Sequence, residues 1–583
     1  MSNERIESDL NPREVGKECN ENTRMTPLIT HYPQRYPQTT KIQEKSINRF
    51  GAPSILFSRE RQLFFPPKSV LPLQQRNSST TQFKQRNEQR NQDATAMTNQ
   101  KRPRTYTTWT QLIENYNPHA FPTKTNTITG MTSSPSLTLI PSGEREVVDE
   151  NRATEIIAEW DQQLTALVEG PPSSPSPLVH AIDLSNKSYT AEAALLIADF
   201  LTSEQTYQPC LASGITVANL NDMIASRMEE EGLQVLTTIS NIFSSAKLTK
   251  VDLSDNAMGS KGLQACSMVL GGQRGTLAAL SMCNCGLSKY TMAEIADICI
   301  EKDEEGNCIA QNLHSIEFYN NMSDDDGCDS FARIMAQATQ KLTHIRYSST
   351  RAKKNGSASI SAALVDLAER NCLENVVHLD LADNSFGECY EALAQALVAC
   401  PNLSYLNVKD CMMEDEGTDV VLSSLMDSGC PLVLLDVSGN ELTAEGATKV
   451  GEMIGALSAS LECFHASDNE MTSAGLKVLA KAIPSGAVLR EINLSCNECG
   501  TIGGKALIQC EKRLPNLEKI ELDGNFFLED MVSQLETVFG SRLLHMEDNI
   551  DDDDIDAENG IEEADSDENV DALTKALGDK LTV

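Results

Sequence analysis

The chain has 583 residues, 48 of them basic and 84 acidic, which gives a formal net charge of -36 at pH 7. A protein of that sign repels phosphate, so we expect no direct binding to DNA or RNA. No run of about 18 apolar residues occurs, and no apolar stretch typical of a signal peptide follows the first residue, so we expect neither a transmembrane segment nor secretion.

Residues 1–140 are expected to form a disordered, basic N-terminal region. The first 130 residues hold 19 basic and 11 acidic side chains and are rich in Gln, Asn, Thr, Ser and Pro. Such a composition buries too little apolar surface to fold alone. The basic clusters leave two interpretations open, a solvated segment or a docking or targeting segment.

A capping helix is predicted over residues 145–170. Apolar residues recur there at helical spacing: Val147, Ala153, Ile156, Ile157, Trp160 and Leu164. A repeat array needs a polar outer cap at each end, and Met531 to Phe539 is expected to close the other end.

Residues 178–546 repeat the pattern L-x-x-L-x-L-x-x-N/C. Leu248, Val251, Leu253 and Asn256 form one copy. The last position recurs every 27 to 36 residues, at Asn256, Cys285, Asn321, Thr350, Asn384, Cys411, Asn440, Asn469, Asn497 and Asn525. Two weaker copies lie earlier, near Ile182 and Ile215. The pattern predicts an α/β fold, a leucine-rich-repeat solenoid of the ribonuclease-inhibitor-like horseshoe type with about 12 repeats, each a short parallel strand followed by a helix.

The Asn or Cys that ends each copy is expected to turn inward and to satisfy backbone groups at the bend. The residue just before it should then point outward, at the rim of the array. Asn284, one place before Cys285, is such a residue.

Residues 547–583 form an acidic C-terminal tail. From Glu547 to Asp571 there are 14 acidic residues and no basic one, and their repulsion is expected to keep this part unfolded. The spacing of apolar residues after Val570 allows a short amphipathic helix at the end.

No motif for independent catalysis is present. The sequence shows no nucleophile paired with a base and no metal-ligating constellation, so we expect neither a cofactor nor a metal. Gly500 to Lys505 (GTIGGK) lacks the spacing of a phosphate loop, and Ala506 replaces the Ser or Thr that would hold magnesium, so we interpret it as a repeat turn entering a helix. The 17 cysteines lack the density of a disulfide scaffold and favour a reducing, intracellular compartment.

Several stretches are similar to one protein family. These are Asn219 to Arg227 (NLNDMIASR), Val251 to Gly259 (VDLSDNAMG), Leu280 to Leu287 (LSMCNCGL), Phe318 to Met322 (FYNNM) and Met413 to Thr418 (MEDEGT). Together with the acidic body and the acidic run after the last repeat, they resemble the GTPase-activating proteins of the nuclear-transport GTPase Ran, especially the plant branch. The resemblance covers residues 145–583. The Trp-Pro-Pro domain of plant members has no equivalent here, since Phe65, Pro66 and Pro67 do not match it.

The resemblance implies a role for two residues. The family's essential asparagine falls on Asn284 and its arginine on Arg227. The family is known to hold the GTPase's own glutamine in its water-orienting pose, which assigns that task to Asn284 and leaves Arg227 a supporting role, whether catalytic or structural. An arginine finger supplied by Arg227 is the alternative mechanism.

The resemblance also implies a partner surface and a location. The expected partner-binding residues are Asp255, Asn256, Asp252, Glu317, Asn320, Asp383 and Asp410. The implied partner is Ran in its GTP form, with a Ran-binding protein as a further partner. The chain would act as a monomer in the cytoplasm or at the nuclear envelope. It would then be a GTPase activator that works in trans, with no active site of its own.

A second interpretation is a leucine-rich-repeat binding module without catalysis, of the ribonuclease-inhibitor or sensor type. Inhibitors of that kind have more cysteine at the repeat position, where this chain has only Cys285 and Cys411 among the ten strong copies. Sensor proteins would carry a nucleotide-binding domain, and the sequence shows none. Stimulation of GTP hydrolysis at substoichiometric amounts separates the two interpretations, because a pure binder does not turn over.

Overall fold

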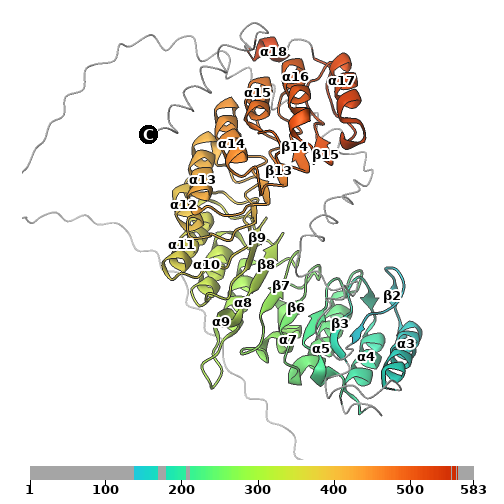
Figure 1. Cartoon of the computed structure of the whole chain (residues 1–583). Helices are drawn as coiled ribbons and strands as arrows, with labels where there is room; N and C mark the ends of the chain where they lie inside the picture. Colours follow the sequence, from blue (N-terminus) through green and yellow to red (C-terminus); the bar gives the residue numbers. More distant parts are fainter. Residues whose placement is uncertain (1–136, 169–178, 205–209, 553–554, 560, 562–583) are drawn as a thin grey trace, which may run out of the picture. The chain divides into compact units, whose positions relative to one another are not determined.

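The computed structural model describes residues 137–168, 179–204, 210–552, 555–559 and 561 (Figure 1). The chain divides into two compact units, residues 1–126 and 127–583, and all described residues lie in the second. The predicted disordered region, except for its last four residues, and the end of the acidic tail lie outside the described residues.

The second unit is built on one parallel sheet of 13 strands. Each repeat strand pairs with the strand of the next repeat, in chain order. The strands are β1 (Leu137–Leu139), β3 (Val179–Asp183), β5 (Val217–Asn219), β6 (Lys250–Asp252), β7 (Ala279–Ser281), β8 (Ser315–Tyr319), β9 (His344–Ser348), β10 (His378–Asp380), β11 (Tyr405–Asn407), β12 (Leu434–Asp436), β13 (Cys463–His465), β14 (Glu491–Asn493) and β15 (Lys519–Glu521). A separate pair is formed by β2 (Val147–Val148) and β4 (Ser188–Tyr189).

The α-helices follow the strands and cover one side of the sheet (Figure 1). They are α3 (Glu150–Val168), α4 (Ala191–Thr202), α5 (Glu229–Ile242), α6 (Gly259–Ala265), α7 (Ser267–Gly271), α8 (Lys289–Ile300), α9 (Ile309–Asn312), α10 (Asp324–Met335), α11 (Lys354–Glu369), α12 (Tyr390–Leu397), α13 (Glu414–Ser428), α14 (Ala444–Ala456), α15 (Thr472–Ala482), α16 (Thr501–Cys510), α17 (Glu529–Phe539) and α18 (Ile555–Glu558). Short 3₁₀ turns lie at Ala212–Gly214, Phe243–Ser245, Glu511–Arg513 and Gly540–Arg542. We call the uncovered side of the sheet the open face.

One apolar core runs through all the repeats. Val251, Leu280 and Ile316 occupy one register position in β6, β7 and β8 and are buried against the helices, while the residues that follow them, such as Asp252 and Ser281, face the other way. The core continues without a break from Leu139 to Phe539. This confirms the predicted leucine-rich-repeat solenoid, in which each repeat buries its apolar face only by stacking on its neighbours.

The asparagine that ends each copy of the pattern is buried and bonds the backbone. Asn440 is typical, because its Nδ2 donates to the carbonyls of Val408 (2.9 Å) and Val437 (3.0 Å). Its Oδ1 accepts from the backbone N–H groups of Cys411 (3.2 Å) and Met413 (3.3 Å). These bonds pair backbone groups that the bend leaves without a sheet partner. We call this series of positions the ladder.

The N-terminal end differs in detail from the predicted cap. Helix α3 begins at Glu150 rather than near residue 145, and it buries Trp160, whose Nε1 donates to the Ile140 carbonyl at 3.1 Å. The residues just before the helix form β2, and β1 pairs with β3 and extends the sheet. The sheet therefore includes residues before 140, and β1 pairs backbone groups of β3 that would otherwise lie at the sheet edge.

The C-terminal end contains an incomplete repeat that the sequence analysis overlooked. The Leu544 N–H donates to the Ile520 carbonyl at the edge of β15, at 3.0 Å. Asn549 then binds both backbone groups of Phe527, accepting from its N–H at 3.1 Å and donating to its carbonyl at 2.9 Å. Asn549 therefore extends the repeat pattern beyond residue 546, where the sequence predicts the end of the array.

Part of the acidic tail is also folded, against α16. Gly500 lies at the N-cap of that helix and has no side chain to bind its first N–H groups. The carboxylate of Asp556, in α18, accepts from the Ile502 N–H at 2.9 Å, and Ser473 Oγ accepts from the Gly500 and Gly503 N–H groups. A negative charge at a helix N-terminus is stabilising. This contact explains why residues 555–558 form a helix although the sequence predicts that they are unfolded.

We expect Gly500→Ala to release α18. A methyl group at Gly500 would lie 2.6 Å from Asp556 Oδ1 and 2.7 Å from Ile555 Cγ2, whereas the backbone there is extended and accepts alanine. Loss of a charged hydrogen bond of roughly 1.5 to 3 kcal/mol should speed amide hydrogen exchange in residues 555–559 about 10-fold or more. Asp556→Ala should do the same. Gly271→Ala, where a methyl meets nothing within 4 Å, is the control, and unchanged exchange in Gly500→Ala would contradict the contact.

Candidate functional site

The residue just before each ladder position has a left-handed backbone. The φ values lie between 52 and 69°, at Asn186, Asp222, Asp255, Asn284, Asn320, Ser349, Asp383, Asp410, Gly439, Asp468, Cys496 and Gly524. We call these positions the rim row. Asn, Asp and Gly tolerate this conformation better than other residues, so the backbone alone favours an asparagine at position 284. A functional role for Asn284 needs evidence from its side chain.

The Asn284 side chain belongs to a run of hydrogen bonds between neighbouring repeats. Asn284 Nδ2 donates to Asp255 Oδ1 at 2.8 Å, and Asn320 Nδ2 donates to Asn284 Oδ1 at 3.0 Å. Asn221 Nδ2 donates to the second oxygen of Asp255, at 3.0 Å. We call these four residues, Asn221, Asp255, Asn284 and Asn320, the amide chain. Asp255, Asn284 and Asn320 are exposed, so the Asn284 amide lies at the surface and is held there by two hydrogen bonds.

Arg227 lies at the end of the loop that also contains Asn221. Its guanidinium is 3.5 Å from the Glu231 carboxylate in the first turn of α5, and 16% of its side chain is exposed. Its backbone N–H donates to the Ile224 carbonyl at 3.1 Å. As placed, Arg227 packs inside the loop and does not extend from the surface as a finger would. Asn221, in the same loop, donates to Asp255, which in turn accepts from Asn284. The loop that holds Arg227 is therefore hydrogen-bonded to the amide chain.

The predicted partner residues lie in three different places. Asp255, Asn320, Asp383 and Asp410 are exposed on the rim row. Asp252 and Glu317 lie on the open face, half-buried, two strands apart. Asn256 is corrected, because it is fully buried on the ladder, where its Nδ2 donates to the Leu220 and Leu253 carbonyls at 2.8 and 2.9 Å, out of reach of any partner.

The rim row becomes acidic beyond the amide chain. Burial raises the pKa of the Asp410 carboxyl, the negative charges of Asp383 and Asp468 raise it further, and Lys409 opposes them. On the open face, burial likewise raises the pKa of Asp252, whose oxygen accepts the Ser254 N–H at 2.9 Å. Carboxylates held this close favour the approach of a basic partner, mainly through a faster encounter.

The middle of the open face bears an ion pair with an aromatic neighbour. Arg346 Nε lies 3.0 Å from Asp380 Oδ2, and its guanidinium lies 4.1 Å from the centre of the Tyr319 ring. Arg346 thereby neutralises the acidic row of the open face between Glu317 and Asp380, which the register places on either side of it.

A second charged network on the open face was not anticipated from the sequence. His465 Nδ1 lies 3.7 Å from Asp436 Oδ2, and its Nε2 lies 3.5 Å from Glu491 Oε1, which Lys519 also contacts at 3.0 Å. Burial alone would lower the pKa of His465, but hydrogen bonds and charges from Asp436 and Glu491 raise it to about 9. At neutral pH this histidine is therefore a buried cation.

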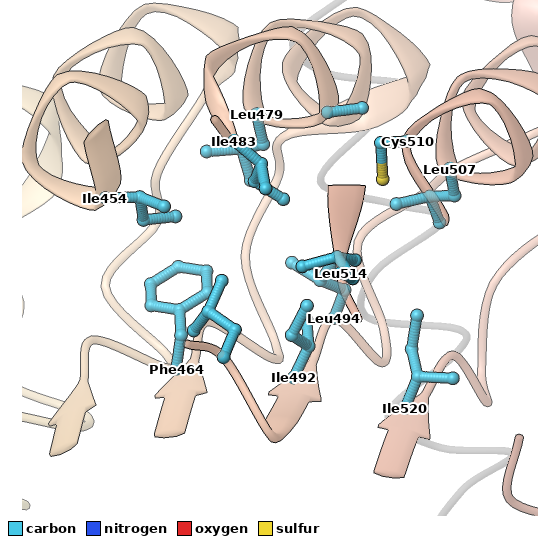
Figure 2. A pocket seen from close by; sticks show the side chains of 12 residues that line it. Ile454, Phe464, Leu479, Ile483, Ile492, Leu494, Leu507, Cys510, Leu514 and Ile520 are labelled. Carbon is cyan, nitrogen blue, oxygen red and sulfur yellow. The ribbon is translucent and has the colours of Figure 1, made fainter. Parts of the chain in front are cut away.

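A void of about 10 Å³ lies between the β13 to β15 strands and their helices (Figure 2). Its lining is aliphatic and aromatic apart from the thiol of Cys510, as Ile454, Phe464 and Ile492 illustrate. So small an apolar space stays empty, and it has no polar group to orient a ligand. Within the described residues no group of three His, Cys, Asp or Glu side chains could hold a metal ion, and no helix there has the length and hydropathy of a membrane span.

Comparisons with known proteins support the repeat fold and a partial likeness to one family. The Leucine Rich repeat model matches residues 244–265 and 430–451. RAN GTPase-activating protein 2 of Arabidopsis thaliana is 28% identical over 137 residues, 23% of this chain and 24% of that protein. RAN GTPase-activating protein 1 of the same plant is 29% identical over 134 residues, 23% of this chain and 22% of that protein.

The likeness extends to other repeat proteins. Tonsoku-like protein of Bos taurus is 29% identical over 229 residues, 36% of this chain and 16% of that protein. The chain matches about a quarter or less of the length of these three relatives. It is a leucine-rich-repeat protein with partial similarity to Ran GTPase-activating proteins.

Proposed function

We propose that this protein stimulates GTP hydrolysis by the small GTPase Ran, and that Asn284 is the residue that acts on the GTPase. The observation that supports this most directly is the amide chain, which holds an exposed asparagine at the position that the sequence resemblance assigns. The partial match to two plant Ran GTPase-activating proteins supports the same partner.

The proposed mechanism requires no chemistry from the protein itself. A GTPase hydrolyses GTP slowly until its glutamine orients the attacking water, and activating proteins raise the rate by up to about 10⁵, or about 7 kcal/mol. The Asn284 amide, with one N–H and one lone pair left by its two neighbours, would bind the glutamine amide of Ran and restrict it to that orientation.

The acidic surface suits this partner. Asp383 and Asp410 on the rim and Asp252 and Glu317 on the open face would speed the encounter with a basic surface of Ran or of a Ran-binding protein. In this proposal the protein acts as a monomer, in the cytoplasm or at the nuclear envelope. The four residues of the amide chain follow the successive paired strands β5, β6, β7 and β8.

The test is single-turnover hydrolysis of Ran-bound GTP with a substoichiometric amount of this protein. We expect the whole pool of GTP to be hydrolysed at a rate proportional to protein concentration, and we expect that rate to saturate only when the protein is in excess over Ran. If hydrolysis is no faster than with Ran alone, the proposal fails. Binding of Ran without faster hydrolysis would instead support the second candidate, a non-catalytic repeat module, which the leucine-rich-repeat fold also allows.

Arg227→Ala distinguishes a supporting arginine from an arginine finger. Because the guanidinium is mostly buried beside Glu231, we expect the variant to loosen the loop and raise the half-saturating protein concentration about 10-fold, with stimulation recovering at high concentration. An arginine finger would instead lose nearly all stimulation at saturation with affinity retained. Arg227→Lys, which keeps the charge but not the planar group, should lie between alanine and the wild type.

A further inference from the structure

Asp255 joins two asparagines that come from the repeats on either side of it. Its Oδ1 accepts from Asn284 Nδ2 at 2.8 Å and its Oδ2 accepts from Asn221 Nδ2 at 3.0 Å. A carboxylate has two oxygens and donates no hydrogen bond, so both ends of this one are used inside the protein. The Asp255 side chain is therefore directed along the rim, toward its neighbours, more than outward to a partner.

The contacts of Asp255 and Asn320 fix the orientation of the Asn284 amide. An asparagine presents oxygen on one side and NH₂ on the other, and exchanging them reverses its donors and acceptors. Since the Asp255 carboxylate only accepts, the NH₂ group of Asn284 must face it. On the other side Asn320 donates to Asn284 Oδ1 at 3.0 Å, which requires the same orientation.

We propose that Asp255 is a positioning residue, which sets the Asn284 amide in the orientation that holds the glutamine of the GTPase. This inference rests on the proposed function and replaces the direct partner contact that the sequence analysis expected of Asp255. Reversal of the Asn284 amide would place its oxygen against the Asp255 carboxylate. It would also exchange the hydrogen-bond donor and acceptor that face the glutamine of the GTPase.

The rim backbone does not itself require a carboxylate at this position. Gly439 and Gly524 occupy the same row with the same left-handed backbone and no side chain. Aspartate at position 255 is thus explained by its two hydrogen bonds rather than by the turn. Because glycine satisfies the backbone, Asp255→Gly removes the carboxylate without straining the chain.

The kinetic test separates positioning from partner contact. Asp255→Gly should lower the maximal single-turnover rate of Ran about 10-fold and leave the half-saturating concentration unchanged. Asp255→Asn, whose single oxygen can accept from only one of the two amides, should retain an intermediate rate. Asp468→Gly, at the same rim position near the other end of the array, is the control for loss of a rim carboxylate. A raised half-saturating concentration at an unchanged maximal rate would overturn the proposal, because it would mean that Asp255 contacts the partner.

A double variant adds an independent check. If Asp255 acts only through Asn284, adding Asp255→Gly to Asn284→Gly should cause no further loss of rate. Two losses that multiply would show that Asp255 acts by another route and would overturn the proposal.

The orientation of the Asn284 amide can be measured in the absence of any GTPase. The side-chain NH₂ resonance of Asn284, identified by its loss in Asn284→Asp, should exchange slowly with solvent in the wild type. In Asp255→Gly it should exchange at least about 10-fold faster, because one hydrogen-bond acceptor is gone. Unchanged exchange overturns the positioning role whatever the protein does to Ran. Lack of stimulation by the wild type, with the expected change in exchange, overturns the proposed function alone.

Discussion

Asn284→Ala is expected to lower by about 100-fold the maximal rate at which this protein makes Ran hydrolyse GTP, equivalent to about 3 kcal/mol of transition-state stabilisation. The exposed amide is the group proposed to hold the glutamine of the GTPase, and alanine removes both its donor and its acceptor. The loss should appear in the rate at saturating protein rather than in the half-saturating concentration. Single-turnover hydrolysis across a concentration series measures both quantities. A wild-type rate for Asn284→Ala at saturation would remove the assignment.

Two controls separate this effect from strain in the turn. Asn284 has φ of 52°, where alanine costs about 1 kcal/mol, so Asn284→Gly should lose the same rate without that penalty. Asn186→Ala places the same substitution in the same left-handed conformation, at φ of 56°, three repeats away. It should lose comparable stability and keep the full rate. If Asn186→Ala also lost activity, strain in the array would be the cause.

The repeat period was sufficient to predict the sheet and the ladder. The pattern L-x-x-L-x-L-x-x-N/C predicts the buried apolar residues of the strands and the inward asparagine, because only stacked repeats bury those leucines. The same period identified the rim position of Asn284. It could also have identified the final cap, since Leu544, Met546 and Asn549 keep the second half of the pattern, but a single incomplete copy lacks the leading leucine.

Contacts between side chains of neighbouring repeats were harder to predict. The amide chain depends on residues 34, 29 and 36 positions apart that meet only because three strand pairs are in register. The sequence pattern fixes that register but not the side-chain rotamers, and it gives no sign that Asp255 turns along the rim. For Asn256 the pattern alone gives the right answer. It is the inward-turning last position of its copy, so the expectation that it binds a partner conflicts with the pattern itself.

The acidic tail shows a limit of composition arguments. Fourteen acidic residues without a basic one predict an unfolded segment, because the prediction uses the mean charge of the whole segment. Asp556 is nevertheless held in place, because its carboxylate accepts a hydrogen bond at the N-terminus of α16, where Gly500 leaves room for it. One specific contact of this kind is decided by the geometry of another repeat, more than 50 residues away, and not by local charge.

The buried cation at His465 should make the stability of the repeats depend on alkaline pH. Its pKa in the folded protein is about 9, above the ordinary value of 6.5, so the protonated form stabilises the fold. That stabilisation is complete below about pH 6.5 and is lost as the pH rises through 9, and its size is on the order of 3 kcal/mol. His465→Gln should therefore be less stable than the wild type at about pH 6 and about equally stable at about pH 10.

The comparison with His465→Gln matters because lysine, tyrosine and cysteine side chains also titrate at alkaline pH and destabilise both proteins alike. Urea titrations of the two proteins at each pH give the difference in unfolding free energy, in which those shared contributions cancel. His545→Gln, at an exposed histidine in the C-terminal cap, should change stability by less than about 0.5 kcal/mol at every pH. A difference between the wild type and His465→Gln that stays constant from acid to alkaline pH would mean that His465 is neutral between Asp436 and Glu491. In that case its contribution to the fold would be packing and hydrogen bonding, not charge.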